Sequence, residues 1–231
     1  MNSKTHLPKI IVALDFSDKK SADQFVSRVN PKLCILKIGK HLFTRLGPDY
    51  VRELIQKGFS IFLDLKFHDI PNTVADACTA AAELGVWMMS IHVSGGIEMM
   101  KAARRAVDQF SPQPLLIGVT LLTSLDEQYL KWLGVADSVE NTVLKFAKAA
   151  KEYRLDGVVC SAHEAALLRQ ALGKDFLLVT PGIRLEVDEN QDQKRVMTPK
   201  AAFAAGADYL VIGRSITGVA DPAKLLSAHN H

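Results

Sequence analysis

The chain has 231 residues, of which 48% are hydrophobic and 23% are charged, a balance typical of a globular protein rather than a disordered or fibrous one. Its net charge of +3 is too small to indicate nucleic-acid binding, although it suits a small anionic ligand. No apolar run approaches the roughly 20 residues of a membrane-spanning helix. Residues 1–9 show no signal-peptide apolar region, and the three cysteines lack metal-site spacing. We therefore expect a cytoplasmic protein with reduced, buried cysteines.

Short apolar runs alternate with helix-like segments along the whole chain. The runs are almost continuously apolar, as expected of parallel strands that are covered on both faces. The expected strands are Ile10–Leu14, Leu33–Ile38, Ser60–Leu65, Trp87–Val93, Leu115–Leu121, Gly157–Cys160, Phe176–Val179 and Tyr209–Ile212. The expected helices are one from Asp18 to near Val29, then Pro71–Leu84, Gly95–Phe110, Ser138–Arg154, Ser161–Leu172 and Pro199–Ala205.

Eight strands with helices between them predict a (β/α)8 TIM barrel that takes up residues 1–231 as a single domain. An open sheet that binds a dinucleotide would carry a glycine-rich first turn, whereas residues 15–18 here contain no glycine. Two segments are longer than simple connections. Residues 124–137 are expected to hold a short extra helix, and residues 181–198 to form a mobile lid at the end of the barrel where such folds carry their chemistry.

The densest group of charges lies in residues 64–69, directly after an apolar run. Side chains alternate along an extended strand, so Asp64 and Lys66 should point to the same side. Asp69 follows in a turn, and Pro71 should begin a helix. Three charges at a strand end are costly to bury unless they pair or take part in chemistry, although a solvated turn with an incidental ion pair would also fit this spacing.

The barrel prediction brings further polar groups to the same end as this charged segment. The carboxyl ends of the other expected strands carry Asp15, Lys37, His92, Thr120, Thr123, Pro181-Gly182 and Gly213-Arg214. His92 is also expected as a hydrogen-bonded structural residue and Thr120 as a partner of neighbouring backbone. We expect the remaining side chains to line one cavity.

Gly213-Arg214-Ser215 suits a phosphate, because glycine allows close approach to backbone N–H groups and arginine donates to phosphate oxygens. Arg184, Gln193, Lys194 and Arg195 on the long loop could close over the same group, although Lys194 and Arg195 fit a solvated charge run better. The seven histidines form no HxH, HExxH or close His/Asp cluster, so we expect no metal site.

Across almost its whole length the sequence resembles the orotidine 5′-phosphate decarboxylase family, in its compact bacterial form. The segments that carry the resemblance are 12–15 (VALD), 36–39 (LKIG), 64–73 (DLKFHDIPNT), 92–96 (HVSGG), 119–124 (VTLLTS), 180–184 (TPGIR), 195–199 (RVMTP) and 211–215 (VIGRS). The resemblance implies a barrel that acts as a homodimer, uses no cofactor or metal, and converts orotidine 5′-phosphate to uridine 5′-phosphate and CO2 in de novo pyrimidine synthesis.

The resemblance also assigns roles to individual residues of this chain. Lys66 would donate a proton to the pyrimidine carbon that loses its carboxylate, with Asp64 beside that carboxylate. Lys37 would bridge Asp64 and the ribose. The remaining assignments are Asp15 on the ribose, Thr123 on the pyrimidine edge, Gln193 on pyrimidine and phosphate, Arg184, Gly213 and Arg214 on the phosphate, and Asp69 and Thr73 in the neighbouring subunit's site.

Two other functions are compatible with parts of this pattern. A metal-dependent phosphosugar barrel, such as a hexulose-phosphate synthase, a keto-gulonate-phosphate decarboxylase or a ribulose-phosphate epimerase, could place charged residues at the same strand end. The first two resemble this chain in their Asp-x-Lys-x-x-Asp segment. The paired lysines Lys37 and Lys66 and the missing metal cluster argue against all three. A non-catalytic nucleotide-binding barrel is disfavoured by the intact set of Lys37, Asp64, Lys66 and Asp69.

Overall fold

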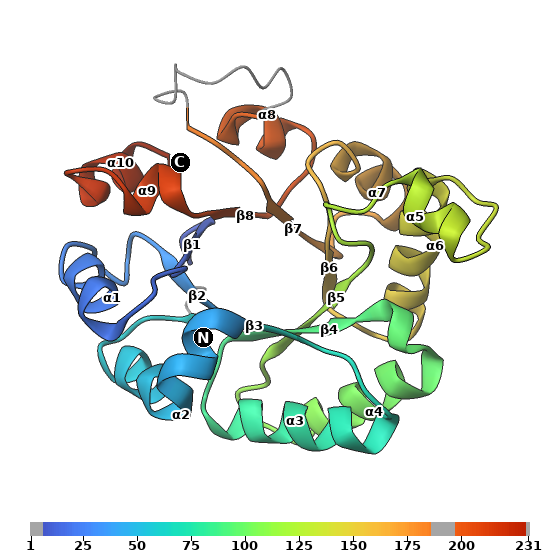
Figure 1. The fold of residues 1–231 in the computed structure, drawn as a ribbon, viewed down its shortest axis with the longest axis horizontal. Helices are drawn as coiled ribbons and strands as arrows, with labels where there is room; N and C mark the ends of the chain where they lie inside the picture. The colour runs from blue at the N-terminus through green and yellow to red at the C-terminus, as the bar shows by residue number, and fades with distance from the viewer. Residues whose placement is uncertain (1–6, 186–196, 230–231) are drawn as a thin grey trace.

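A computed structural model describes residues 7–185 and 197–229, and these form a closed barrel of eight parallel strands surrounded by helices (Figure 1). The strands follow chain order around the barrel: β1 (Ile10–Ala13), β2 (Ile35–Gly39), β3 (Ile61–Phe67), β4 (Met88–His92), β5 (Leu115–Val119), β6 (Gly157–Val159), β7 (Leu177–Pro181) and β8 (Tyr209–Ile212). The expected (β/α)8 architecture is confirmed. β8 has the predicted bounds, and the ends of the other strands lie within two residues of the prediction.

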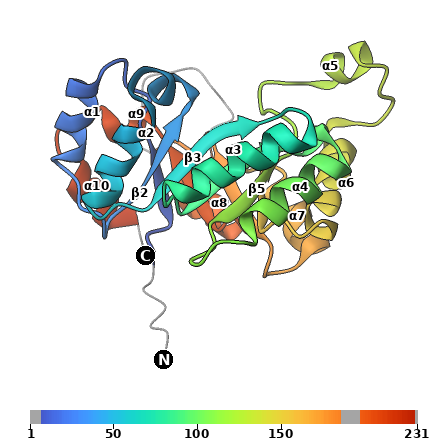
Figure 2. The ribbon, with the colours of Figure 1, turned by 90° about the horizontal axis from the view of Figure 1, so that it is seen from below.

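Helices follow each strand and pack outside it. They are α1 (Lys19–Val26), α2 (Lys40–Gln56), α3 (Pro71–Glu83), α4 (Ile97–Val107), α5 (Glu127–Trp132), α6 (Val139–Glu152), α7 (Ala165–Leu172), α8 (Pro199–Ala204), α9 (Arg214–Thr217) and α10 (Pro222–His229), with a 3-10 turn at Val93–Gly95. None of the helices in the described part of the chain is both long enough and apolar enough to span a bilayer. The short helix expected within residues 124–137 is α5, which stands out from the barrel above α6 (Figure 2).

The sequence did not predict α2 or α10. Two shorter pieces meet at Gly47 within α2, where φ is +66°, and Pro48 follows directly. A left-handed glycine and a proline both interrupt the periodicity from which a helix is recognised. By contrast, α1 begins as expected, because the Asp18 carboxylate accepts the Ser21 backbone N–H at 2.8 Å.

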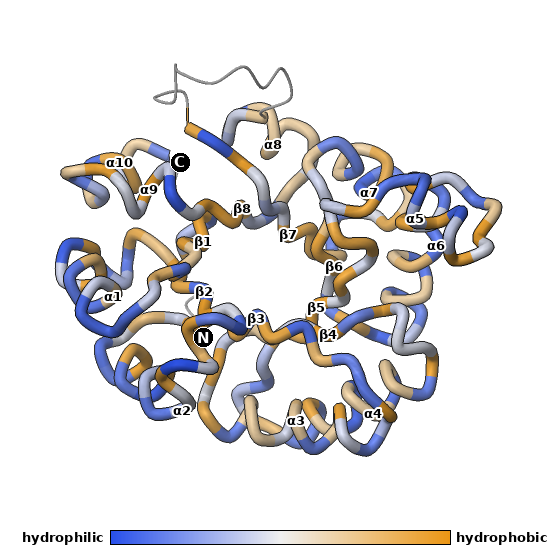
Figure 3. Tube along the Cα trace, in the orientation of Figure 1, coloured by the Kyte–Doolittle hydropathy of each residue, from blue (hydrophilic) through white to orange (hydrophobic). Residues whose placement is uncertain are grey.

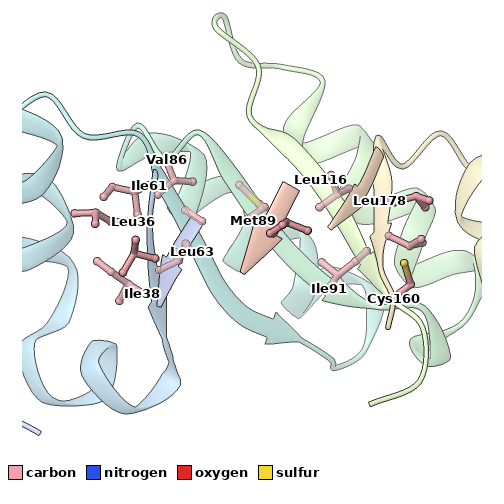
Figure 4. Packing of buried hydrophobic residues seen from close by; sticks show 14 of the residues in the cluster. Leu36, Ile38, Ile61, Leu63, Val86, Met89, Ile91, Leu116, Cys160 and Leu178 are labelled. Carbon is pink, nitrogen blue, oxygen red and sulfur yellow. The ribbon is translucent and has the colours of Figure 1, made fainter. Parts of the chain in front are cut away.

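The larger part of the core lies between the strands and the helices. The hydropathy pattern shows it plainly, with apolar strands in the middle and polar helix faces outside (Figure 3). Figure 4 shows part of this packing, in which Leu36, Ile61, Met89 and Leu116 meet the surrounding helices. Cys34, Cys78 and Cys160 are buried in the same core, as expected of small packing residues. Burial also raises the pKa of each thiol to about 12.

A second, smaller core fills the inside of the barrel and supports the site above it. Its buried members are Ile11, Ala13, Ile35, Phe62, Met88, Ile117, Val179 and Val211. Successive strand residues alternate faces, so residues two positions further along point into the same interior. On β2, β3 and β4 these next inward residues are Lys37, Asp64 and Ser90, which are polar and buried. The interior therefore changes from apolar to charged toward the carboxyl ends of the strands.

The opposite end of the barrel carries two matching ion pairs. Arg104 of α4 donates to Asp156 at 2.9 Å, and the same carboxylate oxygen accepts the backbone N–H of Leu116 at 2.7 Å. Two strands further around, Arg169 of α7 donates to Asp208 at 2.6 Å, and that carboxylate accepts the backbone N–H of Leu178 at 2.7 Å. Each aspartate precedes one strand and ties it to the previous strand and to a helix.

Candidate active site

A cavity of about 320 Å³ opens at the carboxyl ends of the strands, within the size range of small-molecule sites. Its floor is the apolar barrel interior, including Phe62, Val119 and Val159. Charged groups from β1, β2 and β3 stand on one side of it. The other lining residues are Ala13, Asp15, Lys37, Asp64, Lys66, Leu121, Leu122, Thr123, Pro181, Gly182, Val211 and Gly213.

Four of these side chains form a line of alternating charge. The Lys37 ammonium lies 3.8 Å from Asp15 and 3.5 Å from Asp64, and the Lys66 ammonium donates to Asp64 at 2.6 Å. Lys37 is 8% exposed and Asp64 is 7% exposed, so these two charges depend on each other rather than on water. The sequence prediction that Asp64 and Lys66 face the same way is confirmed by their contact.

The surroundings of Asp64 keep its carboxylate ionised. Burial alone would raise its pKa, but the ammonium groups of Lys37 and Lys66 and the hydrogen bonds from Lys66 and Ser90 outweigh that cost and hold the pKa below its usual value. The site therefore presents one fixed negative charge between two positive ones. Such an arrangement can stabilise a charge that develops nearby with little rearrangement of the protein.

The backbone at Lys66 departs from the extended conformation that the sequence suggested. Lys66 has a φ of +51°, in the left-handed region, and the β3–β4 register shifts between Leu63 and Phe67. A residue other than glycine in this region costs about 1 to 3 kcal/mol, a cost met mostly at functional sites. The Lys66–Asp64 contact is thus made across a bulge in β3 rather than along a regular strand.

Ser90 holds this bulge and was missed by the sequence prediction. Its hydroxyl accepts the Lys66 backbone N–H at 3.0 Å and donates to the Asp64 carboxylate at 2.8 Å. It lies on β4 and is fully buried. The only signal in the sequence was a lone serine in an apolar strand, two residues before His92 and therefore on the same face.

The segment after β3 turns outward. Asp69 is exposed and its carboxylate accepts the backbone N–H of Ile70 at 2.7 Å, while the Ile70 side chain is 66% exposed. Thr73, in the first turn of α3, is also exposed. Neither Asp69 nor Thr73 lines the cavity of its own chain.

Two polar residues at the strand ends, Thr120 and His92, lie near the cavity without lining it. Thr120 donates to the Val159 carbonyl at 3.0 Å, which confirms its expected role toward neighbouring backbone. The half-buried His92 ring lies 5.2 Å from that of His68. The hydrogen bond expected for His92 is not found among the described residues. Burial first, and then electrostatic repulsion from His68, Lys40 and Lys66, lower the pKa of His92 to about 4.

Comparisons with known proteins agree with this geometry. Residues 8–228 match the model of the family described as "Orotidine 5'-phosphate decarboxylase / HUMPS family". An orotidine 5′-phosphate decarboxylase of Coxiella burnetii is 59% identical over 223 residues, covering 96% of this chain and 94% of the relative. One from Pseudoalteromonas atlantica is 54% identical over 224 residues, covering 96% and 97%. This chain belongs to the orotidine 5′-phosphate decarboxylase / HUMPS family.

Solved structures extend the similarity to three dimensions. The crystal structure of orotidine 5′-phosphate decarboxylase from Lactobacillus acidophilus has a TM-score of 0.86 and 36% identity, covering 96% of both chains. An uncharacterized conserved protein from Geobacillus kaustophilus has a TM-score of 0.83 and 39% identity, covering 96% of this chain and all of that one. This member of the decarboxylase / HUMPS family therefore has the same barrel fold as a solved orotidine 5′-phosphate decarboxylase.

The structure of this family member brings together about half of the predicted site residues. Asp15, Lys37, Asp64, Lys66, Thr123 and Gly213 line the cavity. Arg184 is half-buried and Arg214 is exposed at the start of α9, and neither lines the cavity. Gln193, with Lys194 and Arg195, lies outside the described residues, as does most of the expected lid.

Within residues 7–185 and 197–229, no three His, Cys, Asp or Glu side chains are grouped so that they could hold a metal ion. The acids at the mouth, Asp15 and Asp64, have lysine partners instead.

Proposed function

We propose that this protein decarboxylates orotidine 5′-phosphate to uridine 5′-phosphate and CO2 in the de novo synthesis of pyrimidines, in the cytoplasm and without metal or cofactor. The observation that carries the proposal is the line of alternating charge through Lys37, Asp64 and Lys66 at the edge of an apolar cavity. The named relatives, at 54–59% identity over nearly the whole chain, support the same reaction.

The reaction has two steps that these side chains can assist. The bond between the pyrimidine ring and its carboxylate breaks, CO2 leaves, and the electron pair remains on the ring carbon. Lys66 then donates a proton to that carbon and later regains one from solvent. The Lys66 ammonium is fixed at 2.6 Å from Asp64 before substrate arrives, so it can stabilise the negative charge as it develops.

Asp64 serves the same reaction in a second way. In this proposal its carboxylate lies beside the substrate carboxylate, so the two negative charges disfavour the bound substrate relative to the state in which CO2 has left. Lys37 contacts both Asp64 and Asp15, which suits a bridge between the reacting end and the ribose hydroxyls. Thr123 lines the cavity where the pyrimidine edge would lie.

The phosphate would bind at Gly213 of the cavity wall, directly after the strand β8 that pairs with β1, and at Arg214 at the start of α9. Arg184 and Gln193 would reach the same phosphate, Gln193 also touching the pyrimidine. The phosphate is remote from the reacting carbon, so its binding energy can close the 181–198 loop and assist the chemical step indirectly.

We further propose that the active form is a homodimer with shared sites. Asp69 and Thr73 are exposed and lie outside the cavity of their own chain, while Ile70 between them is an exposed apolar side chain. These features suit a segment that enters the partner's site. Mixing Asp69→Ala with Lys66→Ala subunits should restore activity, because some sites of the mixed dimer then carry neither change. A mixture as inactive as its components would contradict site sharing.

An ultraviolet assay of orotidine 5′-phosphate loss, with and without excess EDTA, tests the reaction itself. We expect equal turnover in both conditions. A rate that disappears with EDTA and returns with a divalent metal would favour the phosphosugar branch of the family. Protein that binds uridine 5′-phosphate but never consumes orotidine 5′-phosphate would favour a non-catalytic nucleotide-binding barrel.

A further inference from the structure

Ser90 occupies a position from which one hydroxyl can act on two site residues. It follows Met88 on the inner face of β4, and its strand neighbour on β5 is Ile117. The apolar residues below provide no hydrogen-bonding groups for this hydroxyl through their side chains. Its exposed fraction is zero, so water does not compete for it. Both of its partners therefore come from the bulge in β3.

The two hydrogen bonds of Ser90 use its donor and one of its acceptor positions at once. The hydroxyl hydrogen goes to Asp64 Oδ1 at 2.8 Å, and the hydroxyl oxygen accepts the Lys66 backbone N–H at 3.0 Å. The other carboxylate oxygen, Oδ2, accepts a hydrogen bond from the Lys66 ammonium at 2.6 Å and lies 3.5 Å from the Lys37 ammonium. The two oxygens of Asp64 thus have different, fixed partners.

The backbone bond has a further consequence for Lys66. Where the β3–β4 register shifts, the Lys66 N–H is bonded to the side chain of Ser90. This contact supports the left-handed φ of +51° at Lys66. Without it, the N–H would lose its partner at a half-buried position, and the main chain would be free to relax toward an extended conformation that turns the side chain away.

We propose that Ser90 is a positioning residue for the decarboxylation: its hydroxyl orients the Asp64 carboxylate and holds the Lys66 backbone in the conformation that aims the ammonium at the reacting carbon. Ser90 itself does not touch the reacting atoms in this proposal. The assignment to catalysis rests on the proposed function, whereas the effect on Asp64 and Lys66 can be measured without substrate.

The test is Ser90→Ala, with Ser90→Thr as the variant that keeps the hydroxyl. In Ser90→Ala we expect kcat to fall about 10- to 100-fold with KM changed less than about threefold, because a small misplacement of a catalytic group mainly slows the chemical step. The acid limb of the kcat/KM profile should move to higher pH, since the charged form of Asp64 loses a donor. Ser90→Thr should recover most of kcat.

Two controls separate positioning from a general loss of structure. Thr180→Val removes another fully buried hydroxyl, on β7, and should leave kcat and the pH profile unchanged. If Ser90→Ala does not fold, Ser90→Cys keeps a similar volume with only a weak donor, and the same fall in kcat is expected. A Ser90→Ala or Ser90→Cys protein with wild-type kcat and pH profile would overturn the proposal.

Amide hydrogen exchange at Lys66, measured by NMR without ligand, makes the outcome independent of the reaction. We expect exchange at this amide to be at least about tenfold faster in Ser90→Ala, because its hydrogen-bond acceptor is gone. Unchanged exchange would show that Ser90 does not hold Lys66. If the wild-type protein fails to consume orotidine 5′-phosphate, the proposed function fails, and the exchange result still decides what Ser90 does.

Discussion

Replacing Lys66 by alanine removes the group that carries most of the proposed mechanism. The loss has two parts. A positioned proton donor contributes about 10²- to 10⁴-fold in rate. A fixed positive charge about 4 Å from a developing negative charge contributes about 4 kcal/mol at an effective dielectric constant near 20, or about 10³-fold.

The two parts together would give about 10⁵- to 10⁷-fold. Asp64 lies 2.6 Å from the same ammonium and cancels some of its charge, so the electrostatic part is an upper value. We therefore expect kcat to fall at least about 10⁴-fold in Lys66→Ala. The fold should persist, because Lys37 still neutralises Asp64 and Ser90 still binds it.

The assay is the absorbance change of orotidine 5′-phosphate, with enzyme made in a host that lacks its own decarboxylase. Circular dichroism checks the fold. Lys40→Ala is the matched control, since Lys40 is a lysine at the same end of the barrel that does not line the cavity. We expect its kcat to stay within about threefold of wild type, as is usual for a charge outside the reacting centre. A Lys66→Ala enzyme within tenfold of wild type would refute the mechanism.

Three other changes probe the rest of the molecule. Arg214→Ala should lower kcat/KM about 100-fold, mainly through a higher KM, because a charged phosphate contact of roughly 2 to 3 kcal/mol is lost. Steady-state kinetics at low and saturating substrate measure both constants, and an unchanged KM would contradict the phosphate role. NMR titration should find His92 neutral at pH 7, with a pKa of about 4. As pH falls, His92 is protonated near pH 6.5 in the unfolded state but only near pH 4 in the folded state. The unfolding free energy should therefore fall between about pH 6.5 and 4, and His92→Gln should remove that part of the pH dependence. Asp208→Asn should lower the unfolding free energy measured by urea denaturation by about 2 kcal/mol, because Arg169 loses its carboxylate partner, and kcat should stay unchanged. A large fall in kcat would contradict the separation of the two barrel ends.

The architecture could be predicted because parallel strands in a barrel are covered on both faces. Continuous apolar runs such as Leu115–Leu121 and Tyr209–Ile212 are typical of such strands, and their number suggests closure. The position of Lys37 and Asp64 in the mouth follows from the same alternation of side chains. The helix over residues 40–56 escaped prediction because Gly47-Pro48 interrupts its pattern at a kink.

The details that organise the site depend on contacts between strands. The left-handed backbone of Lys66 has no local signal, since lysine is not a residue that favours positive φ. It is stabilised by Ser90, which is 24 residues away in sequence. Asp69 and Thr73 were assigned to the partner's site by resemblance alone, whereas Arg184 and Arg214 were also expected near the phosphate from their residue type and position. All four roles remain predictions, and the Asp69→Ala and Arg214→Ala experiments test two of them.

The two Arg–Asp ion pairs at the amino end of the barrel indicate which parts of the protein can tolerate change. The Arg104–Asp156 and Arg169–Asp208 arrangements repeat one another down to the backbone N–H that each aspartate binds. At the other end, the cavity is lined by charged residues after β1 and on β2 and β3, and by apolar or small residues such as Val159, Gly182 and Gly213. The amino end thus holds repeated contacts that stabilise the barrel, and the carboxyl end holds the side chains of the candidate site. Substitutions at the carboxyl ends of the strands could therefore change substrate specificity, while the ion pairs at the amino end keep the strands in register.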